Sequence, residues 1–304
     1  MTSASKKRLL GIGGAHIDRR GMMREPFIAG ASIPGSMMEE PGGGVFNALR
    51  VAVQFGVNAS LISVRGGDAA GDSVAAAAKR SGLEDLSSTF LDRTTASYTA
   101  LLNSEGDVVA ALADMDIYET ALPRQISRRA TREAIAACDA ILTDANMPEA
   151  AIQKLLGITG KTPVFALAIS PAKAVRLRPV LHLFAGLFLN RREALAILGR
   201  DPSDTSLLMD LASGLITLGL TRAILSDGGA PVCIIDHGTV QCLTPPTPSR
   251  IVDVTGAGDA MAGAALSAFM KGDNWEVAAV KGLEAARMTV ESELAVVEFA
   301  VQNE

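Results

Sequence analysis

Short apolar segments alternate with segments of helical spacing along most of the chain, and this alternation restricts the fold more than any other feature of the sequence. From about residue 126 onward, helical segments separate four short apolar strands, at 140–143, 163–168, 186–189 and 223–226. Parallel strands need a crossover between them, which is usually a helix. The order therefore predicts an α/β fold with a mostly parallel sheet and helices on both faces, whose ligands bind beyond the carboxyl ends of the strands.

A β-hairpin interrupts this alternation in the N-terminal half. Residues 97–102 and 108–113 have the composition of strands, and they flank a polar, glycine-containing turn at 103–107. Together with an earlier segment, this hairpin is expected to form a small β lid that projects from one edge of the sheet. We find no linker and no internal repeat. The sequence thus predicts one domain with two lid segments: residues 1–304 for the domain, and about 15–45 and 95–118 for the lid.

The overall composition excludes several classes of protein. With 48% apolar residues among 304, the chain can bury a large core, so disorder is excluded as its main state. A net charge of −5 and scattered lysines and arginines do not provide the basic surface of a nucleic-acid binder. No apolar run is long enough to span a bilayer, and glycines, His16 and Asp18 interrupt the N-terminal stretch too early for a signal peptide. We therefore expect neither a nucleic-acid partner nor a membrane.

Cysteines and histidines are too few and too dispersed for most metal sites. The three cysteines, Cys138, Cys233 and Cys242, have no metal-type spacing, and an odd count without a disulfide framework is typical of a reducing cytosol. We therefore expect free thiols and a cytoplasmic protein. Three histidines in the whole chain exclude a histidine-rich metal site and leave few candidate bases for a Ser-His-Asp hydrolase.

The strongest chemical signal is the glycine-rich run DVTGAGD, from Asp253 to Asp259, which precedes a stretch small and apolar enough to be a buried helix. Glycines let consecutive backbone N–H groups point at one spot where a helix begins, and both this nest and the helix dipole favour an anion there. Asp259 lies in the first turn and can accept the proton of an attacking hydroxyl group, as a kinase base must. The structural alternative is a glycine turn capped by an aspartate, which is a common helix start.

Other segments favour the catalytic interpretation, because they occur with this loop in a recognisable order. They are Gly13-Gly14 with Asp18, Pro41-Gly42-Gly43-Gly44-Val45-Phe46-Asn47, Gly67-Asp68-Ala69-Ala70-Gly71, Asn190-Arg191-Arg192-Glu193 and the loop itself. Over nearly the whole chain, this order resembles the ribokinase (phosphofructokinase-B) family. The resemblance implies a ribokinase-like three-layer α/β/α sandwich and the ATP-dependent phosphorylation of a small sugar or nucleoside.

The resemblance assigns the substrate hydroxyl groups to two places in the N-terminal part. These are Asp18 and the Gly-Gly-x-x-x-Asn segment, here Gly42, Gly43 and Asn47. Considered one at a time, Asp18 could be a turn former and Asn47 an ordinary residue at a helix N-terminus. The coincidence of all the motifs in register favours the substrate role.

The chemistry itself is assigned to the glycine-rich loop. Gly256, Ala257 and Gly258 would form the anion hole, and Asp259 would be the catalytic base. Members of the family often bind a monovalent cation beside the anion hole. Because Asp253 and Thr255 match the positions involved, K⁺ is a candidate cofactor.

The resemblance also implies ATP and Mg²⁺ as cofactors. Asn190 and Glu193 match the Asn-x-x-Glu segment that serves the magnesium and phosphate network, although Glu193 could also be an ordinary solvated helix residue. The adenine-side segment of the family is usually Thr-x-Gly-x-x-Gly. Here it begins with Ser226 and keeps Gly228, but its last glycine is replaced by Pro231, which alters the expected nucleotide pocket.

Within the family, the chain is most similar to the pseudouridine kinase branch. The segments that carry this similarity are 113–119 (ADMDIYE), 170–173, 176–179, 190–194, 254–260 and 289–293. The similarity implies that the 5′-hydroxyl group of pseudouridine is the acceptor, with Asp116 and Lys173 as substrate contacts. A carboxylate such as Asp116 could accept a hydrogen bond from a uracil N–H, and such contacts discriminate strongly. Alternatively, Asp114, Asp116 and Glu119 form only a charged connection on the lid surface.

Three functions remain open from the sequence. The chain is a pseudouridine kinase, a kinase of another sugar or nucleoside such as ribose, fructose or adenosine, or a non-catalytic ligand sensor that keeps the fold. The intact loop from Thr255 to Asp259 argues against the sensor, because a sensor needs no base. The edge strands of a projecting lid tend to pair, so we also expect a homodimer through the lids.

Overall fold

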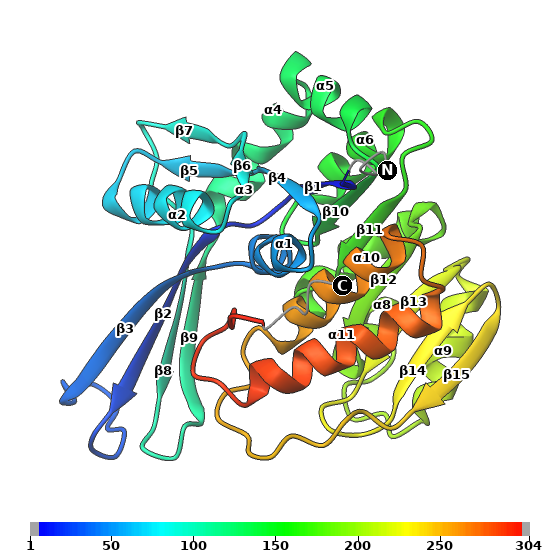
Figure 1. Cartoon of the computed structure of the whole chain (residues 1–304). Helices are drawn as coiled ribbons and strands as arrows, with labels where there is room; N and C mark the ends of the chain where they lie inside the picture. The colour runs from blue at the N-terminus through cyan, green and yellow to red at the C-terminus, as the bar shows by residue number, and fades with distance from the viewer. Residues whose placement is uncertain (1–5, 300–304) are drawn as a thin grey trace.

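The computed structural model describes residues 6–299 and contains a nine-stranded sheet between two layers of helices (Figure 1). The strand order is β15-β14-β13-β12-β11-β10-β1-β4-β6, and neighbours are parallel except for β13 with β14 and β14 with β15. The strands are β1 Arg8–Ile12, β4 Asn58–Ile62, β6 Glu84–Asp85, β10 Ala140–Asp144, β11 Val164–Leu167, β12 Gly186–Asn190, β13 Arg222–Ser226, β14 Val232–Asp236 and β15 Thr239–Leu243. This architecture confirms the predicted α/β/α sandwich with a mostly parallel sheet.

The central strands are buried on both faces, as their uninterrupted apolar composition predicts. Every residue of β10 and of β11 is buried. The parallel register pairs Asp144 with Leu167 and Asn190 with Ser226, which are residues at or near the carboxyl ends of their strands. The carboxyl ends of the central strands therefore lie along one edge of the sheet, and the polar residues at these ends come together there.

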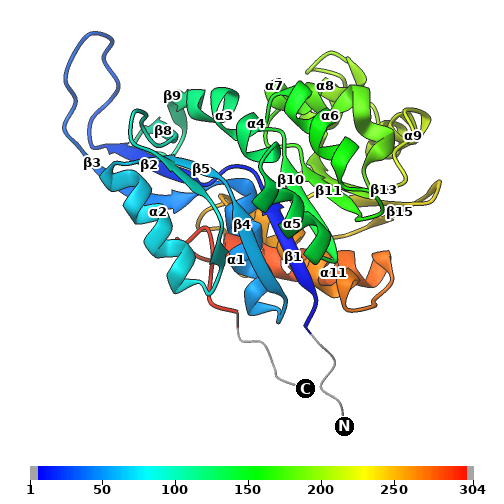
Figure 2. The same ribbon diagram turned by 90° about the horizontal axis from the view of Figure 1, so that it is seen from above.

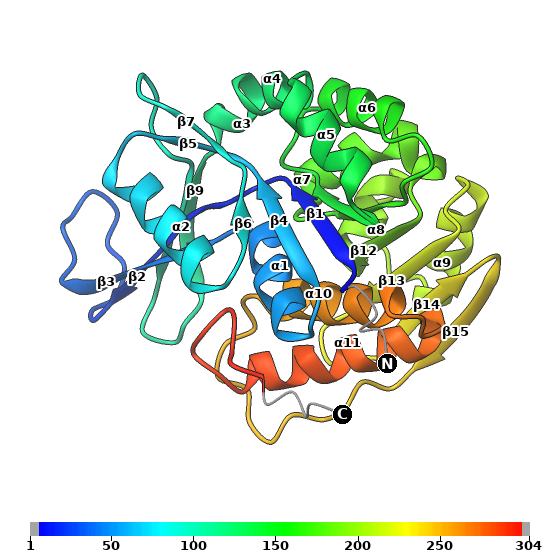
Figure 3. The same cartoon turned by 45° about the horizontal axis from the view of Figure 1, so that its top comes forward.

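Helices cover both faces of the sheet (Figure 3). On one face pack α1 Gly44–Gln54, α2 Ala69–Arg80, α10 Ala257–Met270 and α11 Trp275–Val290. On the other pack α3 Asp116–Thr120, α4 Leu122–Ile126, α5 Arg129–Ala137, α6 Glu149–Ile158, α7 Pro171–Ala174, the 3₁₀ helix η1 Val175–Leu183, α8 Arg191–Leu198 and α9 Leu208–Thr217. None of the helices within residues 6–299 is both long and apolar enough to cross a membrane.

A second sheet of four strands forms the lid, which projects from the body of the molecule (Figures 1 and 2). Its strand order is β3-β2-β8-β9, in which only β2 and β8 are parallel. The strands are β2 His16–Met23, β3 Gly35–Gly42, β8 Ser97–Leu102 and β9 Val108–Asp114. Two further short strands, β5 Val64–Gly66 and β7 Ser88–Phe90, pair with each other. Because β2 follows β1 directly in the chain, the lid begins at the carboxyl end of β1.

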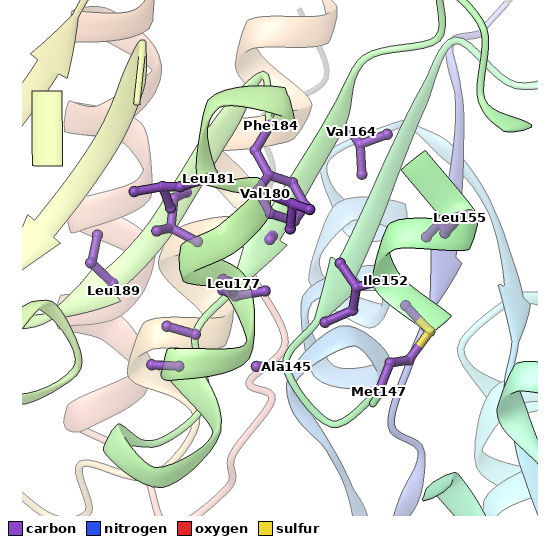
Figure 4. Packing of buried hydrophobic residues seen from close by; sticks show 14 of the residues in the cluster. Ala145, Met147, Ile152, Leu155, Val164, Leu177, Val180, Leu181, Phe184 and Leu189 are labelled. Carbon is purple, nitrogen blue, oxygen red and sulfur yellow. The ribbon is translucent and has the colours of Figure 1, made fainter. Parts of the chain in front are cut away.

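Apolar packing on the two faces of the sheet fixes the segments that line the strand ends. On one face, Leu177 and Leu181 of η1 are buried in the same core as Ile152 of α6 (Figure 4). On the other face, the ring of Trp275 packs against Phe165 of β11. These contacts pack α6, η1 and the α10–α11 pair against the sheet, and the loops that connect them to the strands lie at its edge.

Two details of the secondary structure differ from the sequence expectations. The connection between β11 and β12, expected to be one helix, is the four-residue α7 followed by η1. Pro179 lies inside η1 and has no backbone N–H to donate, which disfavours a continuous α-helix. The strands β5, β6 and β7 have only two or three residues each, too few for a recognisable alternation.

The expectation of three free thiols is wrong for two of the cysteines. Cys233 in β14 and Cys242 in β15 lie directly opposite each other in the antiparallel pair and form a disulfide. Their spacing in the sequence gives no sign of this, because the pairing depends on the hairpin register. That register is set by a tight turn in which His237 and Gly238 both have positive φ. The cysteines therefore do not support a reducing compartment.

Candidate active site

A cavity of about 460 Å³ lies at the carboxyl edge of the central sheet, with lid residues in its wall. This volume is within the usual range for small-molecule sites. Its polar lining comes from many separate elements: His16, Asp18, Asn47, Tyr98, Asn146, Ser170, Lys173, Asn190, Glu193, Ser226, Thr255 and Asp259. Most of the residues predicted to bind or react with ligands thus share one cavity.

Asp259 faces this cavity from the first turn of α10. Its Oδ2 accepts a hydrogen bond of 3.0 Å from the Nδ2 amide of Asn47, near the start of α1. Burial raises the pKa of Asp259 to about 7; the hydrogen bond from Asn47 opposes this shift, and nearby carboxylates such as Asp18 strengthen it. A carboxyl group with a pKa near 7 is suited to exchange protons with a hydroxyl group at neutral pH.

Gly256 shapes the turn that leads into α10. It is the N-cap residue and has a φ of 80°, in the left-handed region. A Cβ atom at this position would lie 2.3 Å from the carbonyl oxygen of Ala295. Both the conformation and the close approach therefore require glycine. The amide of Ala257 donates to the carbonyl of Val254 at 3.4 Å, and the amides that follow it, at Gly258 and Asp259, have no backbone partner and are available to an anion.

Asp18 is held by a small buried network at the base of the lid. Its Oδ1 lies 3.3 Å from Nε2 of His16. The other ring nitrogen of His16 is 3.2 Å from the hydroxyl group of Tyr118, which also accepts a bond of 2.9 Å from the amide of Ala15. Gly42 makes room for this carboxylate, because a Cβ there would lie 1.9 Å from Oδ2 of Asp18. Gly42 thus supports Asp18 without itself lining the cavity.

Asn190 and Glu193 form a reciprocal capping box at the start of α8. The Asn190 side chain accepts from the amide of Glu193 at 3.0 Å, and Glu193 Oε2 accepts from the amide of Asn190 at 2.9 Å. Glu193 is only 5% exposed, so it is not the solvated helix residue of the alternative interpretation. Burial raises the pKa of Glu193 to about 7, against the hydrogen bonds from Asn190. The capping role explains the spacing, and both residues also line the cavity.

Lys173 belongs to a polar chain that sequence reasoning found only in part. Its Nζ donates to Oδ1 of Asn146 at 2.5 Å, and Asn146 in turn donates to Asp144 at 3.0 Å. Asp144 also accepts from the amide of Gly14 at 2.9 Å. Burial lowers the pKa of Lys173. Asp144 and Asn146 could have been found from the sequence, because they end and follow a buried strand where ligands bind.

Besides Gly42, two sequence-predicted residues with substrate or nucleotide roles lie outside the cavity wall, namely Asp116 and Gly228. Asp116, the first residue of α3, is exposed and does not line the cavity, whereas its neighbour Met115 does. Tyr118, from the same segment 113–119, is fully buried, and its hydroxyl group contacts the ring of His16. Gly228 follows the wall residue Ser226 but does not itself line the cavity.

Only some residues of the glycine-rich loop contribute to the wall, and Asp259 at its end is one of them. Thr255 and Gly258 line the cavity, whereas Gly256 and Ala257 form the turn behind them. Asp253, at the start of the loop, lies outside the wall and contacts Arg20 of the lid. Arg20 is not predicted from the sequence, since no local pattern relates it to a loop more than 200 residues away.

A strained turn adds to the wall between β11 and α7. Ile169 lines the cavity with a φ of 69°, one of two positive values among the non-glycine residues within 6–299. The amide of Ser170 donates to the carbonyl of Ala168 at 2.8 Å, so Ile169 is the centre of a γ-turn. Strain of this kind occurs preferentially at functional sites.

The sandwich, the lid and the buried carboxylate at the start of α10 define a kinase of small molecules. The model of the "pfkB family carbohydrate kinase" family matches residues 7–298, and the chain belongs to that family. It is a phosphotransferase with a hydroxyl group as acceptor.

Individual relatives refine this assignment. The chain is 30% identical to the pseudouridine kinase of Escherichia coli (strain K12) over 262 residues, 86% of this chain and 83% of the relative. It is 44% identical to a solved carbohydrate kinase from Agrobacterium tumefaciens, with a TM-score of 0.83 over 95% of this chain and 92% of that one. The Arabidopsis thaliana ribokinase solved with ribose and ATP is 18% identical, with a TM-score of 0.82 over 95% and 94% of the two chains, which shows the common fold.

Proposed function

We propose that this kinase transfers the γ-phosphoryl group of ATP to the 5′-hydroxyl group of pseudouridine. The observation that carries the transfer reaction is Asp259, a carboxyl group with a pKa near 7 that faces the cavity beside the first amides of α10. The acceptor is inferred from the similarity to the E. coli pseudouridine kinase. The lid residues Tyr98 and Met115 line the same cavity, so lid position and acceptor binding are coupled.

In this mechanism, Asp259 accepts the proton of the attacking hydroxyl group. Its hydrogen bond from Asn47 orients one carboxylate oxygen, and the other remains available to the acceptor. The amides of the turn from Gly256 to Gly258 stabilise the charge that develops on the transferred group, because they are fixed before the reaction begins. Asp18, held by His16, binds a hydroxyl group of the ribose.

The residues present fit ATP with magnesium. No cluster of three or more metal-ligating side chains occurs in the described part of the chain, and Mg²⁺ in kinases is typically held by one or two carboxylates together with phosphates and water. Glu193 would supply one such carboxylate from the cavity wall, which Asn190 and Ser226 also line. When bound, the ion would neutralise charge on the phosphates.

A panel of acceptors tests the proposed substrate. Purified protein with ATP and Mg²⁺ is expected to release ADP with pseudouridine far faster than with uridine, ribose, fructose or adenosine, and NMR of the product should place the phosphate at the 5′ position. Turnover that is fastest with another member of the panel would assign the enzyme to that acceptor. Product formation from none of them would contradict the proposal.

The raised pKa of Asp259 predicts the pH dependence of the reaction. Because only the ionised carboxylate can accept a proton, kcat/KM is expected to fall about tenfold per pH unit below pH 7 and to level off above it. With an ordinary pKa of 3.8, the rate would be flat over this range. Glu193 has a similar pKa, so Glu193→Gln serves as the control. Glu193→Gln should show the same fall in kcat/KM below pH 7. If this fall is absent in Glu193→Gln, the group that ionises near pH 7 is Glu193 and not Asp259.

We also propose that the enzyme is a homodimer paired through its lids. Large apolar side chains are exposed along the lid strands: Met22, Met37, Met38, Tyr98, Val108 and Leu112. A soluble lid with this surface is expected to be covered by a partner of the same kind. Light scattering at micromolar concentration should give twice the chain mass. The double variant with Leu112→Lys and Met37→Lys should give a lower average mass. A monomeric mass for the unaltered protein would refute the dimer.

A further inference from the structure

Arg20 joins the lid to the glycine-rich loop. It lies in β2, two residues after Asp18, and its side chain is only 20% exposed. One of its guanidinium nitrogens contacts Glu40 in the neighbouring lid strand β3, and the other contacts Asp253 at the start of the loop. These contacts link the lid to the loop that enters α10.

Asp253 connects Arg20 to the loop that forms the anion hole. Its Oδ1 accepts a hydrogen bond of 2.8 Å from the backbone amide of Thr255, and its Oδ2 contacts Arg20. Thr255 is followed directly by Gly256, the N-cap of α10. Both oxygens of the Asp253 carboxylate are therefore engaged, one in ordering the loop and the other in binding the lid.

A positive charge is required at this corner because three carboxylates meet there. Asp18 and Glu40 are direct partners in the register of β2 and β3, and Asp253 lies on the other side of Arg20. Burial raises the pKa of Glu40, as do the charges of Asp18 and Asp253, whereas Arg20 and, to a smaller extent, Arg50 lower it. Without Arg20, the carboxylates would repel one another and also the phosphates of ATP.

These residues do not fit the monovalent cation that the family resemblance implies at Asp253 and Thr255. The side-chain oxygens of Asp253 are already paired with Arg20 and with the Thr255 amide. A K⁺ ion bound to the same carboxylate would lie against the guanidinium group and be repelled by it.

We propose that the guanidinium group of Arg20 takes the place of the monovalent cation and holds the glycine-rich loop in its phosphoryl-binding form, so that turnover does not depend on K⁺. Arg20 is a positioning residue, since it acts through Asp253 and Thr255. Because Arg20 belongs to the lid, its contact with Asp253 links the lid directly to the loop. The inference rests on the proposed kinase reaction and goes beyond it in naming what replaces the cation.

The experiment compares the full-length protein in potassium chloride and in tetramethylammonium chloride at equal ionic strength. The unaltered enzyme should have the same kcat in both salts, within about twofold. Arg20→Met should lose about 10²-fold in kcat without K⁺, the size expected when anion-hole geometry is lost, with a smaller change in the KM of the acceptor. K⁺ should then restore at least part of the rate, because Asp253 is free to bind it.

Two further variants separate positioning from general damage. Arg20→Lys keeps a positive charge and should retain most of the activity without K⁺. Arg19→Met is the matched control, because Arg19 is adjacent in β2 but pairs with Glu39 and Ser97 instead of Asp253. It should behave as the unaltered enzyme in both salts, and an equal loss of kcat in Arg19→Met and Arg20→Met would overturn the role of Arg20.

A binding readout keeps this inference separate from the choice of acceptor. K⁺ should raise the melting temperature of Arg20→Met but not of the unaltered protein, because only the variant offers a cation site. If no acceptor in the panel is phosphorylated, the proposed acceptor is refuted. The comparison of melting temperatures still decides whether Arg20 occupies the place of the cation. Strong activation or stabilisation of the unaltered protein by K⁺ would overturn the inference.

Discussion

Asp259→Asn is expected to lower kcat by about 10²–10⁴-fold, the range typical for loss of a general base. The substitution keeps the size of the side chain, and its Oδ1 can still accept the hydrogen bond from Asn47. The KM of the acceptor should therefore change little, and the loss should appear in kcat. Release of ADP in a coupled assay measures both quantities. Full turnover in this variant would remove Asp259 from the role of base.

The same variant should be more stable than the unaltered protein at alkaline pH. The pKa of Asp259 is raised in the folded state, from an ordinary value of 3.8 to about 7, so folding binds a proton more tightly. The stability of the native protein must then fall as the pH rises from about 4 to about 7, where the carboxyl group ionises inside the structure. Asparagine never ionises, so its melting temperature should exceed that of the native protein above pH 7 and match it near pH 4.

A matched control is Asp92→Asn, which alters an exposed carboxylate in a loop. Its melting temperature should follow that of the unaltered protein at every pH. A constant difference for Asp259→Asn across the whole range would show that packing, and not the buried charge, distinguishes the variant. Gain of stability with loss of activity is the expected signature of a residue retained for function.

The fold could be predicted from the sequence because several strands can be recognised from their own composition and from the turns beside them. β10 and β11 are short apolar runs buried on both faces, and the hairpin of β8 and β9 has a polar glycine turn between strand-like segments. The disulfide escaped prediction because it depends on pairing between strands. The Cys233–Cys242 disulfide exists because two particular residues are opposite each other in a hairpin, and composition does not encode that register.

The candidate site was predictable where a residue lies inside a motif or at the carboxyl end of a buried strand, as Asp144 does. Asp18, Asn47 and Asp259 belong to recognisable segments and do face one cavity. By contrast, the link from Arg20 to Asp253 joins segments more than 200 residues apart, and the hydrogen bond from Tyr118 depends on how α3 packs. The similarity to the pseudouridine kinase branch predicts Asp116 as a substrate contact, and its place at the start of α3 leaves it exposed and outside the cavity wall.

Gly256→Ala is expected to lower kcat by about 10²–10³-fold, comparable to the loss of an anion-hole donor. A methyl group at this position would lie 2.3 Å from the carbonyl oxygen of Ala295, and alanine is strained at a φ of 80°. The turn must therefore shift, and the first amides of α10 shift with it. Steady-state kinetics measure the loss, and the melting temperature shows how far the strain also lowers stability.

Two glycine variants separate the geometry of the turn from general effects of the substitution. Gly157→Ala, in α6, meets no atom within 4 Å and lacks a positive φ, so it should keep full activity. Gly258→Ala is also free of clashes with the protein, but its methyl group would enter the cavity wall, so it should raise KM more than it lowers kcat. If Gly256→Ala instead matches Gly157→Ala in kcat, the amides at this turn do not stabilise the transferred phosphoryl group.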